Sequence, residues 1–378
     1  MFVELHMIQS FAPANLNRDD TNNPKDCEFG GVRRARISSQ CIKRAIRQNP
    51  AFEETTGAEI GMRTKWLMSQ LRQPLLEAGK PEDEIDAILP EVVDKTASKL
   101  DSKAAQKTAV LLYLSQTEID NLVQTLVDRW DALVDEKQRS GAVKALARDF
   151  VKTFKGRTSA PDIALFGRML AQRPALNIDA ACQVAHAIST HRVTMEMDFY
   201  TALDDLNPDD TTGAGMMGFT GYNSACFYRY ARIDWGQLAQ NLGGDVALAR
   251  RTVEGFLRAA VAAVPSGKQN SFAAQNPPEF LLAVVRNRGM GWSLTNAFER
   301  PVRPQREGGL VAPSVAALDS YWDRVRTAYG GDSVARVAAL TLQPALELEA
   351  LADTVVADLE AWVAAMMEAL PYGEEAGG

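Results

Sequence analysis

Apolar residues alternate with polar ones at the start of the chain, where Glu4 and His6 separate three apolar side chains. A period of two predicts a half-buried strand over residues 1–9. Residues 10–31 break this alternation with prolines, asparagines and a pair of glycines, which predicts a long loop. A loop of that length in a compact domain is usually functional or disordered.

The next segment predicts a short strand followed by a helix. Residues 33–38, "RRARIS", have the composition of an extended segment, and "QCIKRAIRQ" over 40–48 has helical spacing. Either Ser38 or Ser39 would cap this helix, and the Asn-Pro step at 49–50 would end it. Its three apolar residues share one face, which suits packing on a sheet.

Helical spacing with few β-branched runs extends from about residue 58 to 175 and predicts an α-helical insertion between the first and second strands of a central sheet. Strand-like segments follow at 162–169, 181–190, 224–234 and 278–287, with helical segments at 245–264 and 314–330. Strands that alternate with helices, with one helical insertion, predict an α+β fold.

The stretch 195–223, "MEMDFYTALDDLNPDDTTGAGMMGFTGYN", has no helical period. Its aromatic start and its Gly-, Met- and Thr-rich end favour a protruding hairpin or arm. A plain surface loop has the same composition, so both interpretations stay open at this point.

Composition narrows the class of protein. The 378 residues are 46% hydrophobic and 24% charged, which predicts a globular chain with a real core. The sequence contains no run of about 18 apolar residues, so we expect no membrane span. The four cysteines form no CxxC pair and the three histidines no zinc-binding pattern. We therefore expect no metal site, no cofactor and no disulfide framework, and a cytoplasmic location.

One local cluster departs from the formal net charge of -7. Residues 32–48 contain six Arg or Lys and no acid. Gln40, Lys43, Arg44 and Arg47 are spaced i, i+3, i+4 and i+7, so they share one face of the predicted helix. The positive charge continues onto the preceding predicted strand through Arg34 and Arg36. A helix face that only contacts solvent usually carries both positive and negative side chains, which form stabilising i,i+4 ion pairs. Arginine forks, a lysine and the free N–H groups of a helix start favour phosphate, and the length of the array favours a nucleic-acid backbone.

Catalytic motifs are absent. The chain has neither GxxxxGK[ST] nor GxGxxG after a strand. A nuclease needs acids around Mg²⁺, and the candidates are Asp19, Asp20, Asp26 and the pair Asp204-Asp205. Adjacent loop aspartates are more often caps or turn formers, so we expect a protein that is not an enzyme.

Several words of the sequence resemble the repeated backbone subunit (CasC family) of the type I-E CRISPR surveillance complex, Cascade. They are "LNRDD", "KDCEFGG", "RRARISSQ", "IKRAIR", "AHAISTH", "GKQNSFAAQNP", "NAFE" and "YWDRV", and they extend from residue 16 to about 325. The resemblance implies a modified RRM (ferredoxin-like) palm over 1–57 and 160–378, a helical fingers insertion over 58–159 and a thumb hairpin over 194–224.

The resemblance also implies a function. The protein would be a non-catalytic scaffold that binds the CRISPR RNA (crRNA), polymerises head to tail along its spacer with other Cascade subunits, and presents it to target DNA. The guide contacts it implies are Arg18, Lys25, Ser38, Gln40, Lys43, Arg44 and Arg47. The thumb base would be Phe199, Tyr200 and Thr201, and Arg168 and Met169 would form a finger element. Lys268 would face nucleic acid or a neighbouring copy.

Two other hypotheses remain open. One is a metal-dependent ribonuclease that cuts target RNA with a loop aspartate. The other is a structural protein whose helical insertion makes protein contacts only. Met169 also has a structural interpretation as a buried core residue. Phe199 and Tyr200 have one as residues that anchor the hairpin.

Overall fold

The computed structural model describes residues 1–202, 216–306, 308–343 and 346–372. The chain folds as two compact units. The first contains residues 1–52, 183–232 and 254–371, and the second contains residues 53–182 and 233–253 together with Tyr372. A large antiparallel sheet and thirteen helices lie within the described ranges, and this confirms the α+β prediction.

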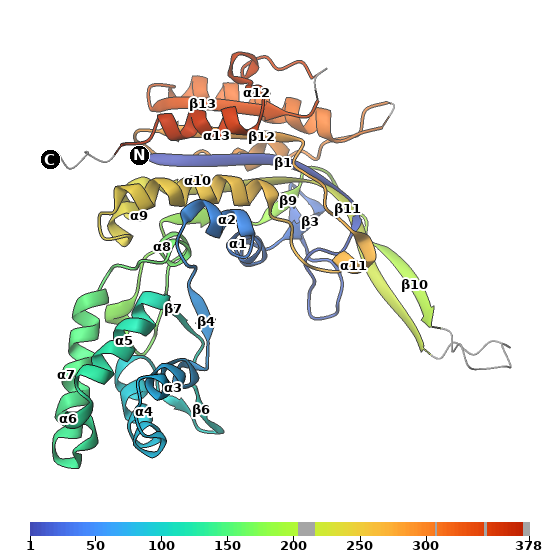
Figure 1. Ribbon diagram of the computed structural model, residues 1–378. Coiled ribbons are helices and arrows are strands. Elements are labelled where there is room, and N and C mark those ends of the chain that lie inside the picture. Colours follow the sequence, from blue (N-terminus) through green and yellow to red (C-terminus); the bar gives the residue numbers. More distant parts are fainter. Residues whose placement is uncertain (203–215, 307, 344–345, 373–378) are drawn as a thin grey trace, which may run out of the picture. The chain divides into compact units, whose positions relative to one another are not determined.

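The first unit is built on a nine-stranded sheet (Figure 1). Its main path has the order β13-β12-β1-β11-β9-β3-β2, and β8 and β10 also pair with β11. The strands are β1 (Phe2–Ala14), β2 (Asp26–Phe29), β3 (Val32–Ile37), β8 (Cys182–Val184), β9 (Ala187–Ser189), β10 (Glu196–Ala202), β11 (Met216–Asp234), β12 (Phe280–Arg286) and β13 (Val334–Thr341).

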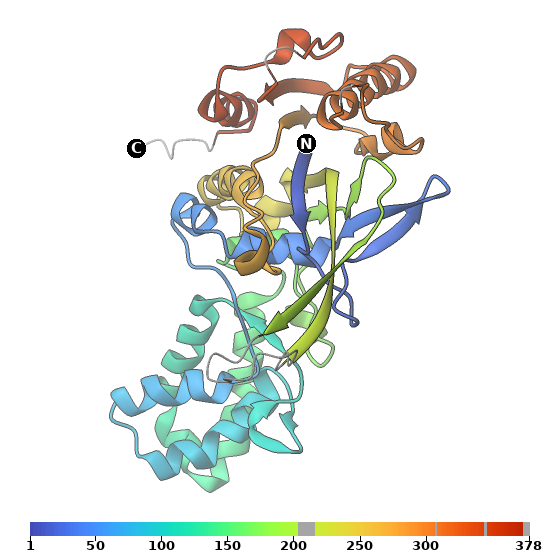
Figure 2. The ribbon, with the colours of Figure 1, turned by 90° about the vertical axis from the view of Figure 1, so that its right-hand side faces the viewer.

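Strand β1 is central, and it is buried on both faces instead of one. Helix α12 (Val311–Tyr329) supplies Trp322 to the core on the face of Ile8. Helices α1 (Ser39–Arg47) and α10 (Val246–Ala262) supply apolar side chains beside Leu5 on the other face. Figures 1 and 2 show these helices on opposite sides of the sheet. The half-buried prediction failed because both faces are covered, so Glu4 and His6 are buried with their apolar neighbours.

The remaining elements of this unit are short helices. They are α2 (Pro50–Thr56), α11 (Gln269–Phe272), α13 (Leu359–Glu368) and the 3-10 helices η2 (Leu294–Phe298) and η3 (Ala352–Thr354). The first residues of α10 and the end of α2 belong to the second unit. The predictions for 245–264 and 314–330 are confirmed by α10 and α12.

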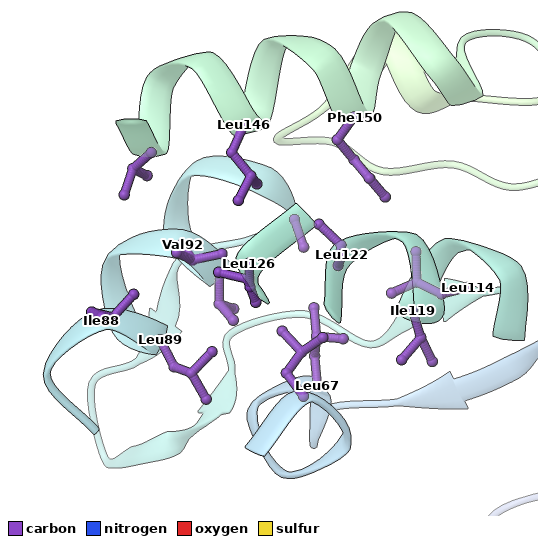
Figure 3. Close-up of a cluster of buried hydrophobic side chains, with 14 of the residues drawn as sticks. Leu67, Ile88, Leu89, Val92, Leu114, Ile119, Leu122, Leu126, Leu146 and Phe150 are labelled. Atoms are coloured by element: carbon purple, nitrogen blue, oxygen red, sulfur yellow. The ribbon is translucent and has the colours of Figure 1, made fainter. Parts of the chain in front are cut away.

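The second unit is mainly helical, as the spacing over 58–175 predicts. Its helices are α3 (Leu67–Glu77), α4 (Glu82–Thr96), α5 (Gln116–Asp128), α6 (Trp130–Val134), α7 (Glu136–Phe154), α8 (Pro161–Phe166), η1 (Pro174–Leu176) and α9 (Trp235–Asn241). Figure 3 shows apolar side chains of α3, α4, α5 and α7 converging on one core. Two small two-stranded sheets, which the sequence did not predict, pair β4 (Met62–Thr64) with β7 (Leu112–Leu114) and β5 (Leu100–Asp101) with β6 (Ala104–Thr108).

Three local predictions need correction. Residues 162–169 form helix α8 and a following turn, because Pro161 begins the helix and a short apolar run buried all round carries no strand period. The predicted loop 10–31 is shorter, because β1 continues to Ala14 and β2 begins at Asp26. Over 181–190 two short strands replace one.

No helix in the described part of the chain is long and apolar enough to cross a membrane.

Candidate nucleic-acid interface

Helix α1 presents the polar face that the sequence predicts. Ser38 is the N-cap: its backbone is extended, with φ -68° and ψ 147°, and its Oγ accepts a hydrogen bond from the Cys41 N–H at 3.3 Å. Ile42 and Ile46 are buried. Gln40 and Arg44 are exposed, and Lys43 is half-buried.

Arg34 does not belong to this surface. Its side chain is fully buried, and the guanidinium donates to carbonyl oxygens of three segments: Phe29 of β2, Ser189 of β9, and Phe298 and Glu299 at the end of η2. The neighbouring Gly30 has φ +61°, and a Cβ there would lie 1.8 Å from the Glu299 carbonyl oxygen. The RNA-binding prediction for Arg34 is therefore corrected, because a buried guanidinium saturated by carbonyls holds these segments together.

Arg47 needs the same correction. It lies in the last turn of α1, just before the chain enters α2, and only 7% of its surface is exposed. Helical spacing placed it correctly on the face of Gln40. The spacing does not show that this residue of the last turn is buried.

The start of α1 also offers fewer free donors than the sequence suggests. The Cys41 N–H is bonded to Ser38, and the Ser39 N–H donates to His186 Nδ1 at 3.2 Å. The N–H of Ser38 donates to the side chain of Asn17 at 2.8 Å. Protein acceptors thus take donors that were expected to bind an anion.

Asn17 fastens the polar loop, residues 15–25, to β3 and to the start of α1. Its side-chain oxygen accepts from Ser38, and its backbone oxygen accepts from the Lys25 N–H at 2.9 Å. The Lys25 carbonyl in turn accepts from the Arg36 N–H at 2.9 Å. These bonds hold Lys25 beside Arg36. Nothing in the sequence distinguishes Asn17 from the other loop asparagines.

His186, which sequence reasoning also missed, completes this cluster from the turn between β8 and β9. Its Nδ1 lies 3.3 Å from Arg36 Nη1. Partial burial lowers the pKa of His186, and the nearby cations Arg36 and Lys25 lower it further. Its only signal in the sequence is its place in the "AHAISTH" segment.

Asp19 of the polar loop and Asp26 at the start of β2 have structural partners. Asp19 Oδ1 accepts from the N–H groups of Thr21 and Asn23, each at 2.9 Å, and from the Thr21 hydroxyl at 2.8 Å. These bonds, the Thr21 hydroxyl above all, lower the pKa of Asp19. Asp26 pairs with Arg33, and Asp20 is exposed. The acid pair Asp204-Asp205 lies outside the described residues.

In this loop Arg18 is exposed and donates to the Asn22 side chain at 2.7 Å. We call the exposed and half-buried residues Arg18, Lys25, Arg36, Gln40, Lys43 and Arg44 the basic surface. A cavity of about 240 Å³ lies at its edge, between Arg44 of α1, the C-cap residue Gln48 and the segment 263–266.

The loop that carries Lys268 packs against the polar loop. Gly267 approaches it so closely that a Cβ would lie 2.3 Å from the Leu16 carbonyl oxygen. Lys268 is half-buried, adopts a left-handed backbone with φ +51°, and begins helix α11. Phe272 of α11 packs on Tyr222 of β11, with ring centroids 5.9 Å apart.

Strands β10 and β11 pair as the predicted hairpin, and its tip, residues 203–215, lies outside the described residues. Phe199 is paired with Phe219, and their rings lie 5.2 Å apart. Tyr200 and Thr201 are exposed, and the Tyr200 ring lies over Gly218. The exposed apolar residues of one hairpin face, which we call the apolar hairpin face, are Met195, Met197, Phe199 and Phe219.

In the second unit Arg168 and Met169 have opposite environments. Arg168 is buried; it donates to both carboxylate oxygens of Glu118 at 2.7 and 2.8 Å and to the carbonyls of Leu176 and Tyr113. Met169 is 83% exposed. Arg168 is therefore corrected from a nucleic-acid contact to an anchor of the turn that exposes Met169.

Comparisons with known proteins support one family. A family model described as "CT1975-like protein" matches residues 3–373. A solved chain of a "CRISPR RNA-guided surveillance complex, pre-nicking" is 32% identical, with a TM-score of 0.84, and the match covers 98% of this chain and 100% of that chain. A second, from a "CRISPR RNA-guided surveillance complex", is 28% identical with a TM-score of 0.76 and the same coverage. No curated protein matches the chain.

Proposed function

The chain belongs to the CT1975-like Cas family, and from this premise we propose that it is a guide-RNA-binding backbone subunit of a CRISPR RNA-guided surveillance complex. The basic surface is the observation that carries the proposal. Its cations lie on a loop, a strand and a helix that a hydrogen-bond network fastens together. An extended positive surface of this kind suits a polyphosphate chain better than a single phosphate.

The chemistry of the basic surface suits backbone recognition. Arginine, lysine and glutamine side chains bind phosphate and ribose oxygens and so fix the register of a nucleic acid without reading its sequence. A guide held by its backbone keeps its bases available for pairing. Base pairing then reads the target DNA, and the protein supports the shape of the paired strands.

We propose further that several copies assemble head to tail along the crRNA spacer with other Cascade subunits, in a type I-E complex. The apolar hairpin face supports this part of the proposal, because four exposed apolar side chains on one hairpin face indicate an interaction surface. A contact between this face and a different surface of the next copy is heterologous, and such contacts generate open helical assemblies. Met169 and Lys268 are further candidates for contact with RNA or a neighbouring copy.

We propose that the chain performs no chemistry. Asp19 accepts three hydrogen bonds within its own turn, and Asp26 is paired with Arg33. These contacts give both carboxylates a structural role, Asp19 in its turn and Asp26 between β2 and β3, which favours the scaffold over the ribonuclease alternative. If Asp20→Ala abolished a Mg²⁺-dependent cleavage of bound target RNA, the scaffold proposal would be wrong.

RNA binding by a charge-deficient variant tests the proposal. The double variant K43A/R44A removes two cations of the basic surface, and fluorescence anisotropy with a labelled single-stranded RNA of mixed sequence measures its affinity over a range of salt concentrations. Each lost phosphate contact reduces the slope of log K against log salt by about 0.7. We therefore expect a slope smaller by about 1.4 and clearly weaker binding.

The matched control is K144A/R148A, which removes two exposed cations four residues apart on α7 of the second unit. It changes net charge by the same amount and keeps the basic surface. We expect its binding and its salt slope to stay close to those of the unchanged protein. Equal behaviour of the two double variants would overturn the proposed site.

A further inference from the structure

His186 links β3 and α1, the strand and the helix that carry most of the basic surface. It lies in the turn between β8 and β9, where the preceding Ala185 N–H donates to the Tyr230 carbonyl at 2.9 Å. Its imidazole is exposed. Arg36 of β3 and Ser39 of α1 both reach the ring, so three separate elements meet there.

The two contacts determine where the ring carries its proton. Both are made to Nδ1, by the Ser39 backbone N–H at 3.2 Å and by Arg36 Nη1 at 3.3 Å. A backbone N–H and a guanidinium are donors and never acceptors. Nδ1 is therefore the acceptor, and the proton of the neutral ring lies on Nε2.

The ring has one further polar group for an external partner. No hydrogen bond to Nε2 is found among the described residues, and the exposed imidazole leaves this atom for a ligand. Partial burial lowers the pKa of His186, and the charged groups that act on the ring, the cations Arg36 and Lys25, lower it further. At neutral pH the ring is an uncharged donor within a cationic cluster.

We propose that His186 is a further RNA-binding residue, which donates its Nε2–H to an oxygen of the guide backbone held by Arg36 and Lys25. The acceptor is a phosphate oxygen or a ribose 2′-hydroxyl, and both are backbone oxygens. The proposal rests on the function proposed above. His186 differs from the cations of the basic surface because it contributes affinity without releasing a counterion.

Two substitutions separate the two nitrogen atoms of the ring. In H186N the amide oxygen takes the place of Nδ1 and retains an acceptor for Ser39 and Arg36, and the outer donor is lost. In H186Q the amide nitrogen reaches the place of Nε2 and retains the outer donor, and the inner acceptor is lost. A positioning role depends on the inner acceptor, and an RNA contact depends on the outer donor.

Anisotropy with the same labelled RNA provides the test. We expect H186N to bind about tenfold more weakly, as for a lost hydrogen bond to a charged or strongly polar group. Its salt slope should match that of the unchanged protein, because no charge is removed, whereas K43A lowers the slope by about 0.7. H186Q should bind within about threefold of the unchanged protein.

A second arm identifies the acceptor. DNA of the same sequence lacks the 2′-hydroxyl. A loss in H186N on RNA alone assigns the contact to the 2′-hydroxyl, and an equal loss on both nucleic acids assigns it to phosphate. Either result supports the proposal.

The failures are distinguishable. Unchanged RNA affinity in H186N, or a larger loss in H186Q than in H186N, would overturn the role of His186 and leave the proposed function intact. If the unchanged protein failed to bind RNA, the proposed function itself would be wrong. Thermal unfolding of both variants confirms that each is folded.

Discussion

The first unit contains two clusters of ionisable and polar side chains, one at the surface and one in the interior. One is the basic surface. The other, which we call the buried polar cluster, is formed by Glu4, His6, Tyr228, Tyr230 and Arg286. In the cluster His6 Nδ1 lies 2.8 Å from the Tyr228 hydroxyl, and Tyr230 donates to Glu4 at 2.8 Å. The Arg286 guanidinium stacks on Trp292, with its central carbon 3.5 Å from the ring centroid.

Both regions contain arginine, and exposure to solvent decides what the ionisable side chains of each region can do. Burial raises the pKa of Glu4 and lowers that of His6 to about 3, so both groups resist the charge they carry in water. On the basic surface the cations are exposed or half-buried, so a ligand can reach them. A residue type therefore does not define a binding site until its exposure is known.

The largest test of this contrast compares Arg33 and Arg34, which are neighbours on β3. R34M removes the donors to four carbonyl oxygens, and buried acceptors without partners are costly. We expect unfolding free energy to fall by about 3 kcal/mol, measured by chemical denaturation.

R33M is the control. The Arg33 side chain is 66% exposed and pairs with Asp26 at the surface, and exposed ion pairs contribute at most about 1 kcal/mol. If the two variants lost equal stability, the assignment of Arg34 to a structural role would be wrong.

The second test uses pH to charge the buried polar cluster. The folded pKa of His6 is about 3 and its ordinary value is 6.5, so the unfolded chain binds more protons between these values. The contribution of His6 to stability is complete above pH 6.5 and is lost as pH falls toward 3. Between pH 6.5 and 5 the loss is about 2 kcal/mol at most, and the raised pKa of Glu4 acts in the opposite direction.

Urea unfolding followed at pH 7 and pH 5 measures this loss. H6N retains an acceptor for Tyr228 and does not titrate, so its stability should depend less on pH than that of the unchanged protein. An equally steep dependence in H6N would assign the acid sensitivity to other groups.

Much of the fold was predictable because its signals are local. The helical spacing of α1, α10 and α12 and the Ser-Ser step before α1 are properties of short segments. The burial of β1 on both faces was not predictable, because it depends on helices that are distant in the sequence. The strands of the second unit are two to five residues long, which is too short for a period to be recognised.

The candidate site was predictable only in part, for the same reason. Spacing correctly placed Gln40, Lys43 and Arg44 on one helix face. It did not reveal that Arg34 donates to the carbonyl of Phe298, or that Arg168 pairs with Glu118, because these partners are distant in sequence. His186 and Asn17 each act through two hydrogen bonds, which leave no periodic signal in the sequence.

The third test concerns Ser38, a buried residue that caps the helix of the basic surface. S38A removes the side-chain acceptor of the Cys41 N–H. The loss of such a cap costs about 1 kcal/mol, so we expect a small decrease in the thermal midpoint. S38T keeps the hydroxyl and should recover most of it. A loss of stability as large as that of R34M would mean that Ser38 does more than cap the helix.

The smallest effect is expected at Arg44, which separates stability from binding. The side chain is exposed, and R44Q removes its charge but keeps a good helix former. Like charges at Arg44 and Arg47 destabilise the helix, and a cation in the last turn stabilises it, by a few tenths of a kcal/mol in each case. We expect unfolding free energy to change by less than about 0.5 kcal/mol while RNA affinity falls. A large loss of stability would show that Arg44 supports the fold as Arg34 does, and the contrast between the two regions would not extend to α1.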